Sequence, residues 1–348
     1  MHVKTIAIAI AIASTQCSSG PHPITITDPP GFVKMGIPED NPLTEEGVAL
    51  GRMLFYDPIL SADSTIACAT CHDPQLSFTD GKPLAEGIQG RKTRRSAPSL
   101  VNVGYYYKGL FWDGRVASLE EQVLMSVEDS VELGNRWEVV EERLQLHPVY
   151  PTYFEKAFGI ESETEIDRYL VAKAIAQFER TLISRDSKFD LVLRGEAEFT
   201  EAEQRGWTIY FDVSDELPKS ECGHCHLDPL FTNLDFFNNG IEQVAGLESF
   251  PDRGRGAVTG WKYNNGQFRT PTLRNIELTA PYMHDGRMKT LDEVLEHYIS
   301  GGHFAENVNP NVRKLHFTES DKEDLTAFLK TLTDTVFIQN PAFATPFQ

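Results

Sequence analysis

Basic charge, cysteine and long apolar runs are all scarce in this chain, and each scarcity narrows the kind of protein it can be. Lysine and arginine together number 32 in 348 residues, against 51 aspartates and glutamates, so the formal net charge is −19. Nucleic-acid binding needs clustered positive charge to meet the phosphates, so we exclude it. The acidic balance favours a basic partner, or simply keeps the protein dissolved.

The one marked apolar run lies at the N-terminus and is too short for a stop-transfer membrane span. It covers Ile6–Ala13 and follows Lys4, which is typical of a signal peptide. Cys17 comes soon after, as at the cleavage site of a bacterial lipoprotein, although Gln16 stands where a small residue is usual. We predict a signal peptide over residues 1–17. Two fates of Cys17 stay open: lipidation, which would anchor the protein to a membrane, or ordinary cleavage nearby.

The other four of the five cysteines form two copies of one motif. The copies are Cys68-Ala69-Thr70-Cys71-His72 and Cys222-Gly223-His224-Cys225-His226. In C-x-x-C-H, two thiols at this spacing can bond the vinyl groups of one porphyrin, and the histidine can ligate its iron. A redox dithiol, half a zinc site or chance would explain one copy, but two copies favour two covalently bound haem c groups. Bacteria attach such haems outside the cytoplasm, so we expect a periplasmic protein.

An internal duplication surrounds the two motifs. Leu50–Asp57 precedes the first and Arg205–Asp212 precedes the second at nearly the same distance. Each segment follows a threonine suited to cap a helix, Thr44 or Thr200. Each half therefore begins with a helix whose aromatic end is expected to pack beside its own haem.

Each half also ends in a helical pattern. Apolar residues at helical spacing follow Thr164 in the first half and Thr318 in the second, and no stretch alternates with a period of two. We expect a mainly α fold of two cytochrome c-like haem domains with long loops. The expected order after the signal peptide is a linker (18–42), an N-terminal haem domain (43–190), a C-terminal haem domain (191–336) and a tail (337–348).

Further motifs extend the pattern beyond the haem-attachment sites. They are Phe111-Trp112-Asp113-Gly114-Arg115, Thr270-Pro271-Thr272-Leu273-Arg274-Asn275 and Ala280-Pro281-Tyr282-Met283-His284-Asp285-Gly286. With them the sequence resembles the bacterial di-haem cytochrome c peroxidase family, which includes the methylamine-utilisation enzyme MauG. The resemblance covers roughly residues 43–334. It implies that peroxide reacts at the N-terminal haem and that the C-terminal haem receives and stores electrons.

The resemblance also assigns roles to three side chains. Trp112 falls where the family has a tryptophan between the haems, which implies electron transfer; alone, it would be taken for a buried aromatic. Gln122 and Glu132 match a distal glutamine and glutamate, which implies peroxide positioning and proton transfer by a carboxyl. Without the resemblance, Glu132 would be one more surface acid.

Two departures from the family pattern concern the ligands of the irons. Many members carry a second histidine that blocks the peroxidatic iron, but the corresponding segment, Glu86–Arg91, has none. The first iron should then be open without reductive activation, as in MauG. At the second iron, Tyr298 aligns with the sixth ligand, which is methionine in the peroxidases and tyrosine in MauG; Met283 is the alternative.

The family also binds a calcium ion between the domains. Thr279 and Pro281 match its carbonyl donors, but Ser96 stands where asparagine is usual, and a hydroxyl is a weaker donor. Calcium is expected, at reduced affinity.

Three functions are compatible with these features. The first is a peroxidase that reduces hydrogen peroxide to water with electrons from a basic periplasmic donor, a small cytochrome c or copper protein. The second is a MauG-like oxidase that uses peroxide to modify Trp or Tyr of a partner protein. The third is an electron carrier without enzyme activity, against which Gln122 and Glu132 argue.

Overall fold

The computed structural model describes residues 20–347, and helices dominate its regular structure. The helices are α1 (Glu45–Tyr56), α2 (Cys68–Cys71), α3 (Leu119–Glu128), α4 (Trp137–Gln145), α5 (Tyr150–Phe158), α6 (Arg168–Arg180), α7 (Lys188–Leu193), α8 (Glu201–Tyr210), α9 (Arg255–Thr259), α10 (Leu291–Ser300), α11 (Glu319–Lys330) and α12 (Thr335–Ile338). Two short strands, β1 (Phe236–Phe237) and β2 (Phe268–Arg269), pair antiparallel. Long loops and short 3-10 turns make up most of the rest. The prediction of a mainly α fold is confirmed.

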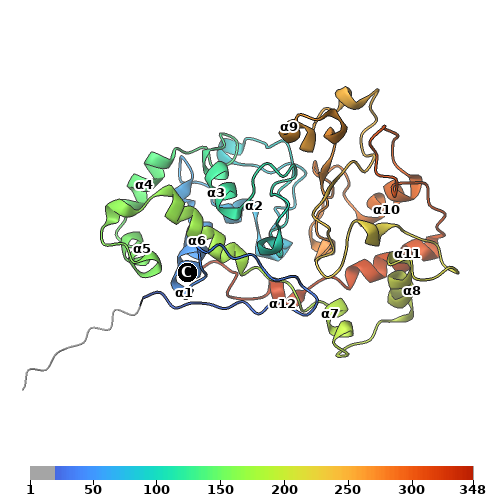
Figure 1. Ribbon diagram of the computed structural model, residues 1–348, viewed down its shortest axis with the longest axis horizontal. Coiled ribbons are helices and arrows are strands. Elements are labelled where there is room, and N and C mark those ends of the chain that lie inside the picture. Colours follow the sequence, from blue (N-terminus) through green and yellow to red (C-terminus); the bar gives the residue numbers. More distant parts are fainter. Residues whose placement is uncertain (1–19, 348) are drawn as a thin grey trace, which may run out of the picture.

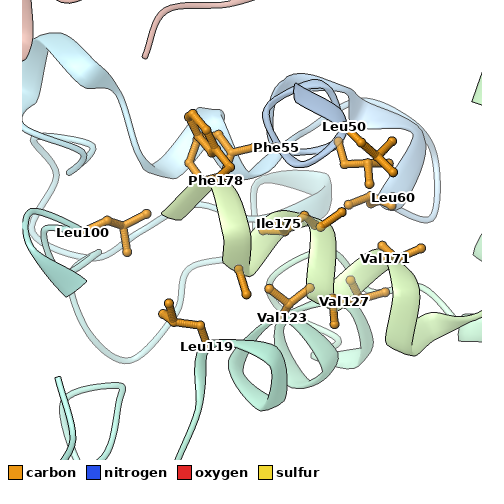
Figure 2. Packing of buried hydrophobic residues seen from close by; sticks show 14 of the residues in the cluster. Leu50, Phe55, Leu60, Leu100, Leu119, Val123, Val127, Val171, Ile175 and Phe178 are labelled. Carbon is orange, nitrogen blue, oxygen red and sulfur yellow. The ribbon is translucent and has the colours of Figure 1, made fainter. Parts of the chain in front are cut away.

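The first half of the molecule, α1 to α6, gathers at one end in Figure 1. Thr44 caps α1, accepting a hydrogen bond from the Gly47 amide, as the sequence predicted. The apolar faces of α1, α3 and α6 meet in one buried core (Figure 2). At Gly51, α1 touches α6 backbone to backbone: a Cβ there would lie 1.9 Å from the Ala174 carbonyl oxygen. Glycine is therefore required at this crossing.

The second half repeats this helix pair with α8 and α11. Thr200 and Thr318 each cap their helix through a capping box. Gly206 is equivalent to Gly51 at this crossing, because a Cβ on Gly206 would lie 2.0 Å from the Asp324 carbonyl oxygen of α11. A second buried core, built around Tyr210 and Phe328, holds the pair together. The internal duplication is thus visible as two equivalent helix crossings, one in each half.

The segments that flank these two cores tie the halves together. Before α1, Met35 packs with Tyr105 of the first half and Leu230 of the second. After α11 the chain returns to the first half, where Phe337 of α12 and Phe343 are buried in the first core. The sequence had placed both phenylalanines in a tail. The expected signal peptide and Cys17 lie outside the described residues.

Membrane-spanning helices were sought among residues 20–347. None of the helices there is both long and apolar enough to cross a bilayer.

Candidate functional site

The first C-x-x-C-H motif lies beside the first core. Cys68 to Cys71 form α2, and His72 follows directly. The His72 Nδ1 lies 2.8 Å from the Phe78 carbonyl oxygen, so the ring donates there and its Nε2 stays available as a ligand. Burial lowers the pKa of His72, which keeps the imidazole neutral, the form that binds metal. The Phe55 ring of α1 packs 6.4 Å from the imidazole, centroid to centroid. That this aromatic end lies beside a haem stays a prediction.

The second motif is built in the same way. The His226 Nδ1 lies 3.0 Å from the Pro271 carbonyl oxygen and 3.2 Å from that of Phe231. Burial lowers the pKa of His226 to about 4, so it too is neutral. The Tyr210 hydroxyl, at the end of α8, donates to the His226 carbonyl oxygen over 2.6 Å. Both histidines are therefore oriented by backbone carbonyls from a neighbouring segment.

None of the four motif cysteines, all within the described residues, belongs to a disulfide. Burial raises the pKa of each, to about 11 for Cys71, Cys222 and Cys225 and further for Cys68. A redox dithiol has a lowered thiol pKa, so these surroundings disfavour that alternative and agree with thiols that become thioethers.

Two buried polar atoms without a hydrogen-bond partner also fit a haem protein. The first is the Oε1 of Gln122 on α3. The second is the Nη1 of Arg269 on β2, whose guanidinium lies 4.6 Å from the centre of the Tyr106 ring. A buried guanidinium without a carboxylate partner calls for an anion, and a porphyrin carries carboxylates. The residues present therefore fit haem in both halves.

Gln122 and Glu132 belong to one short stretch, α3 and the turn after it. Burial raises the pKa of Glu132, against the effect of a hydrogen bond from Ser126. A carboxyl with a raised pKa holds a proton more readily than an exposed one, as a group that transfers protons must.

The 86–91 segment, which lacks the blocking histidine of the family, packs directly on the turn that carries Glu132. The Ile88 amide donates to the Glu132 carbonyl oxygen over 2.8 Å, and a Cβ on Gly87 would lie 1.9 Å from the Val131 carbonyl oxygen. The 86–91 segment therefore supports the backbone of Glu132.

Trp112 is half-buried where the two halves meet. Its indole Nε1 donates to the Ser96 carbonyl oxygen over 2.9 Å, and its own carbonyl oxygen accepts from the Arg269 amide of β2 over 2.8 Å. A cavity of about 70 Å³ lies beside it, lined from both halves. Trp112 is thus held by the first half and the second together.

The three residues expected to bind calcium, Ser96, Thr279 and Pro281, line that same cavity. The Ser96 hydroxyl donates to the Met283 carbonyl oxygen over 3.1 Å. No acidic residue is among the described residues that line the cavity, while Arg269 is. Neutral oxygens beside a cation are a poor donor set for calcium. Calcium stays a prediction.

Tyr298 and Met283, the alternative sixth ligands of the second iron, lie beside one amide. The Nδ2 of Asn239 is 3.3 Å from the Tyr298 hydroxyl and 3.4 Å from the Met283 sulfur. Burial raises the pKa of Tyr298 to about 12, and the bond from Asn239 opposes this rise.

The sequence interpretation missed both Asn239 and Arg269. Arg269 directly precedes the Thr270–Asn275 motif, and an arginine beside a family motif was a usable signal. Asn239 sits in a polar loop, Asn238-Asn239-Gly240, and no local pattern distinguishes it.

Comparison with known proteins identifies the family. A model of the di-haem cytochrome c peroxidase family matches residues 45–198. The methylamine utilization protein MauG of Methylorubrum extorquens is 36% identical over 301 residues, which cover 85% of this chain and 80% of that protein. The cytochrome-c peroxidase IdrP1 of Denitromonas iodatirespirans is 32% identical over 364 residues, 96% of this chain and 94% of that protein.

A solved structure agrees with these relatives. The crystal structure of a MauG-like protein associated with microbial copper homeostasis has a TM-score of 0.85 to this chain at 36% identity. The match covers 93% of this chain and 100% of that one. Sequence and fold thus lead to one conclusion: the chain belongs to the di-haem cytochrome c peroxidase family and is an oxidoreductase.

Proposed function

We propose that the protein reduces hydrogen peroxide to water with two electrons from a basic periplasmic donor. The observation that carries the proposal is the pair Gln122 and Glu132, one with an unsatisfied buried oxygen and the other with a raised pKa. Bound haem c, attached at Cys68, Cys71, Cys222 and Cys225 and ligated by His72 and His226, supplies the iron redox chemistry. Family membership favours this enzyme over an electron carrier.

Glu132 performs the proton transfers in this proposal. Its carboxylate accepts a proton from one peroxide oxygen and returns it to the oxygen that leaves as water. The raised pKa supports both steps, because burial makes this carboxyl take up a proton more readily than an exposed one. Gln122 orients the peroxide through its free Oε1, which can accept a hydrogen bond from the peroxide hydroxyl. Trp112, held between the halves, passes the electrons from the second haem to the first haem.

We also propose that the first site reacts with peroxide without prior reduction. The 86–91 segment contains no histidine, and its backbone packs against residues 131–132. Opening this site therefore requires no displacement of a side-chain ligand from that segment.

A MauG-like oxidation of Trp or Tyr on a partner protein is the second candidate. The observation that favours it is Tyr298, which we propose as the sixth ligand of the second iron. The relative named MauG and the MauG-like solved structure support it as well. Both candidates share the chemistry of Gln122 and Glu132 and differ in where the electrons come from.

The location of the protein follows from the same proposal. We propose export to the periplasm, and lipidation at Cys17 as the way in which the protein would be held at a membrane.

Steady-state turnover of hydrogen peroxide with a reduced small cytochrome c or copper protein tests the proposal. We expect Glu132→Gln to lower the rate roughly 10²- to 10⁴-fold, the usual contribution of a general acid–base group. Glu128→Gln is the matched control, because Glu128 lies on α3 but is exposed. Equal rates in the wild type and the Glu132 variant would contradict the role of Glu132. Slow wild-type turnover with all donors, together with oxidation of an added protein partner, would favour the MauG-like candidate.

A further inference from the structure

The loop that carries Asn239 is fixed by its surroundings. The Asn239 carbonyl oxygen lies 2.9 Å from the His297 Nε2 on α10, and the next carbonyl, that of Gly240, accepts from the His303 amide over 2.7 Å. On the preceding residue, the Asn238 side-chain amide bonds the Asn307 side chain over 2.8 Å. The side chain of Asn239 therefore starts from a backbone that is held on both sides.

From this position, one amide group reaches both alternative ligands. The NH₂ of Asn239 donates to the Tyr298 hydroxyl oxygen over 3.3 Å and to the Met283 sulfur over 3.4 Å. An amide NH₂ has two hydrogens, so both bonds can exist together. The bond to a sulfur is the weaker of the two, because a thioether is a weak acceptor.

Met283 is also restrained at its backbone. Its φ is +75°, in the left-handed region that non-glycine residues rarely adopt. Its carbonyl oxygen accepts from the Ser96 hydroxyl of the first half over 3.1 Å. The backbone of Met283 is therefore tied to the contact between the halves, and its sulfur lies beside Asn239.

We propose that Asn239 is the positioning residue that selects the sixth ligand of the second haem, favouring Tyr298 over Met283. The inference rests on the MauG-like candidate of the proposed function, in which Tyr298 is that ligand.

Two effects of one side chain produce the selection. A hydrogen bond from an amide stabilises negative charge on the phenolic oxygen, the form in which tyrosine ligates iron. The same amide holds the Met283 sulfur by a weak hydrogen bond, which a methionine moving to the iron would have to give up. The selection matters for function, because a tyrosinate lowers the potential of a haem and a thioether raises it.

The test replaces Asn239 in the full-length, haem-loaded protein. Asn239→Leu keeps the size of the side chain but removes both donors, and Asn239→Ser restores one hydroxyl donor. We record the near-infrared and EPR spectra of the ferric protein and the midpoint potential of each haem. For Asn239→Leu we expect loss of the tyrosinate signature, gain of the sulfur-to-iron charge-transfer band and an upward shift of the second potential. Asn239→Ser is expected to lie between this variant and the wild type.

Asn238→Leu is the matched control. Asn238 is the neighbouring residue, and its side-chain amide bonds to Asn307 rather than to Tyr298 or Met283. If the loss of Asn239 acted only by loosening the loop, Asn239→Leu and Asn238→Leu would change the spectra alike. Equal spectral changes in these two variants would therefore overturn the proposal. If Asn239→Leu does not load haem, the test uses Asn239→Ser instead. A midpoint potential of the second haem equal to that of the wild type would then overturn the proposal.

Tyr298→Phe separates the identity of the ligand from the role of Asn239. If the wild type already lacks a tyrosinate signature and Tyr298→Phe leaves its spectra unchanged, the ligand assigned under the proposed function is wrong, and the selection falls with it. If Tyr298→Phe abolishes a tyrosinate signature while Asn239→Leu retains it, only the role of Asn239 is overturned. Peroxide turnover that depends on Glu132 would stand in either case.

Discussion

Two carboxyl groups of the first half, those of Glu132 and Glu179, differ in their surroundings. The Ser126 side chain opposes the rise of the Glu132 pKa, while the Oε2 of Glu179 on α6 has no hydrogen-bond partner among the described residues. Burial raises the pKa of both, to about 8 for Glu179. Only Glu132 belongs to the stretch that carries Gln122, so the two carboxyls can be told apart by what their removal does to turnover.

Glu179 gives a prediction about stability. Its pKa is higher in the folded protein, about 8, than the value of about 4.3 in an unfolded chain. The folded state thus binds the proton more tightly, and stability falls as the pH rises from the unfolded value through the folded one. We expect Glu179→Gln to be more stable than the wild type at pH 8 and about equally stable near pH 4. Melting temperatures across this pH range check it, with the exposed Glu128→Gln as control. A wild-type advantage at pH 8 would show that the Glu179 carboxylate has a stabilising partner.

At the scale of elements, the two helix crossings depend on glycine. Gly51 and Gly206 both face a backbone carbonyl of the partner helix, at distances that exclude a side chain. In each half, this glycine precedes the haem motif by nearly the same number of residues.

Alanine at either crossing should separate the helices. We expect Gly51→Ala and Gly206→Ala each to cost about 3 kcal/mol, because overpacking a tight contact forces the backbone to move. Gly36→Ala is the control, since Gly36 has ordinary φ and no atom lies within 4 Å of the position that its new methyl group would take. Denaturant unfolding measures the difference, and variants as stable as the control would show that the helices can separate at little cost.

Local signals predicted the elements well. Thr44, Thr200 and Thr318 cap their helices as expected, because capping depends on a few adjacent residues. The helix expected after Thr164 begins instead at Arg168, capped by Asp167, since residues 163–165 form a 3-10 turn. A second capping side chain in the same stretch moved the boundary.

Contacts between segments far apart in the sequence could not be predicted from local sequence patterns. The approach of Asn239 to Tyr298 depends on a loop and a helix 59 residues apart in sequence. The burial of Phe337 and Phe343 in the first core depends on the chain returning past the whole second half. Neither arrangement leaves a periodic pattern, so the sequence predicted the helices but not these contacts, and the haem ligands stay a prediction.

At the scale of the whole molecule, hydrogen bonds around Trp112 join the two halves, and we propose that electrons pass between the haems here. Trp112 bonds to Ser96, and the Ser96 hydroxyl bonds to the Met283 carbonyl oxygen, so the indole of the first half is connected to the surroundings of the second haem. The net charge of −19 is suited to attract a basic donor to this molecule. The proposed function requires that electrons from the second haem reach a first haem that peroxide can enter in the resting protein.

The EPR spectrum of the resting ferric protein tests this requirement most directly. We expect a high-spin signal from the first haem, ligated by His72 alone on the protein's side, and a low-spin signal from the second haem in equal amount. A spectrum of two low-spin haems, with no high-spin component, would contradict an open first site.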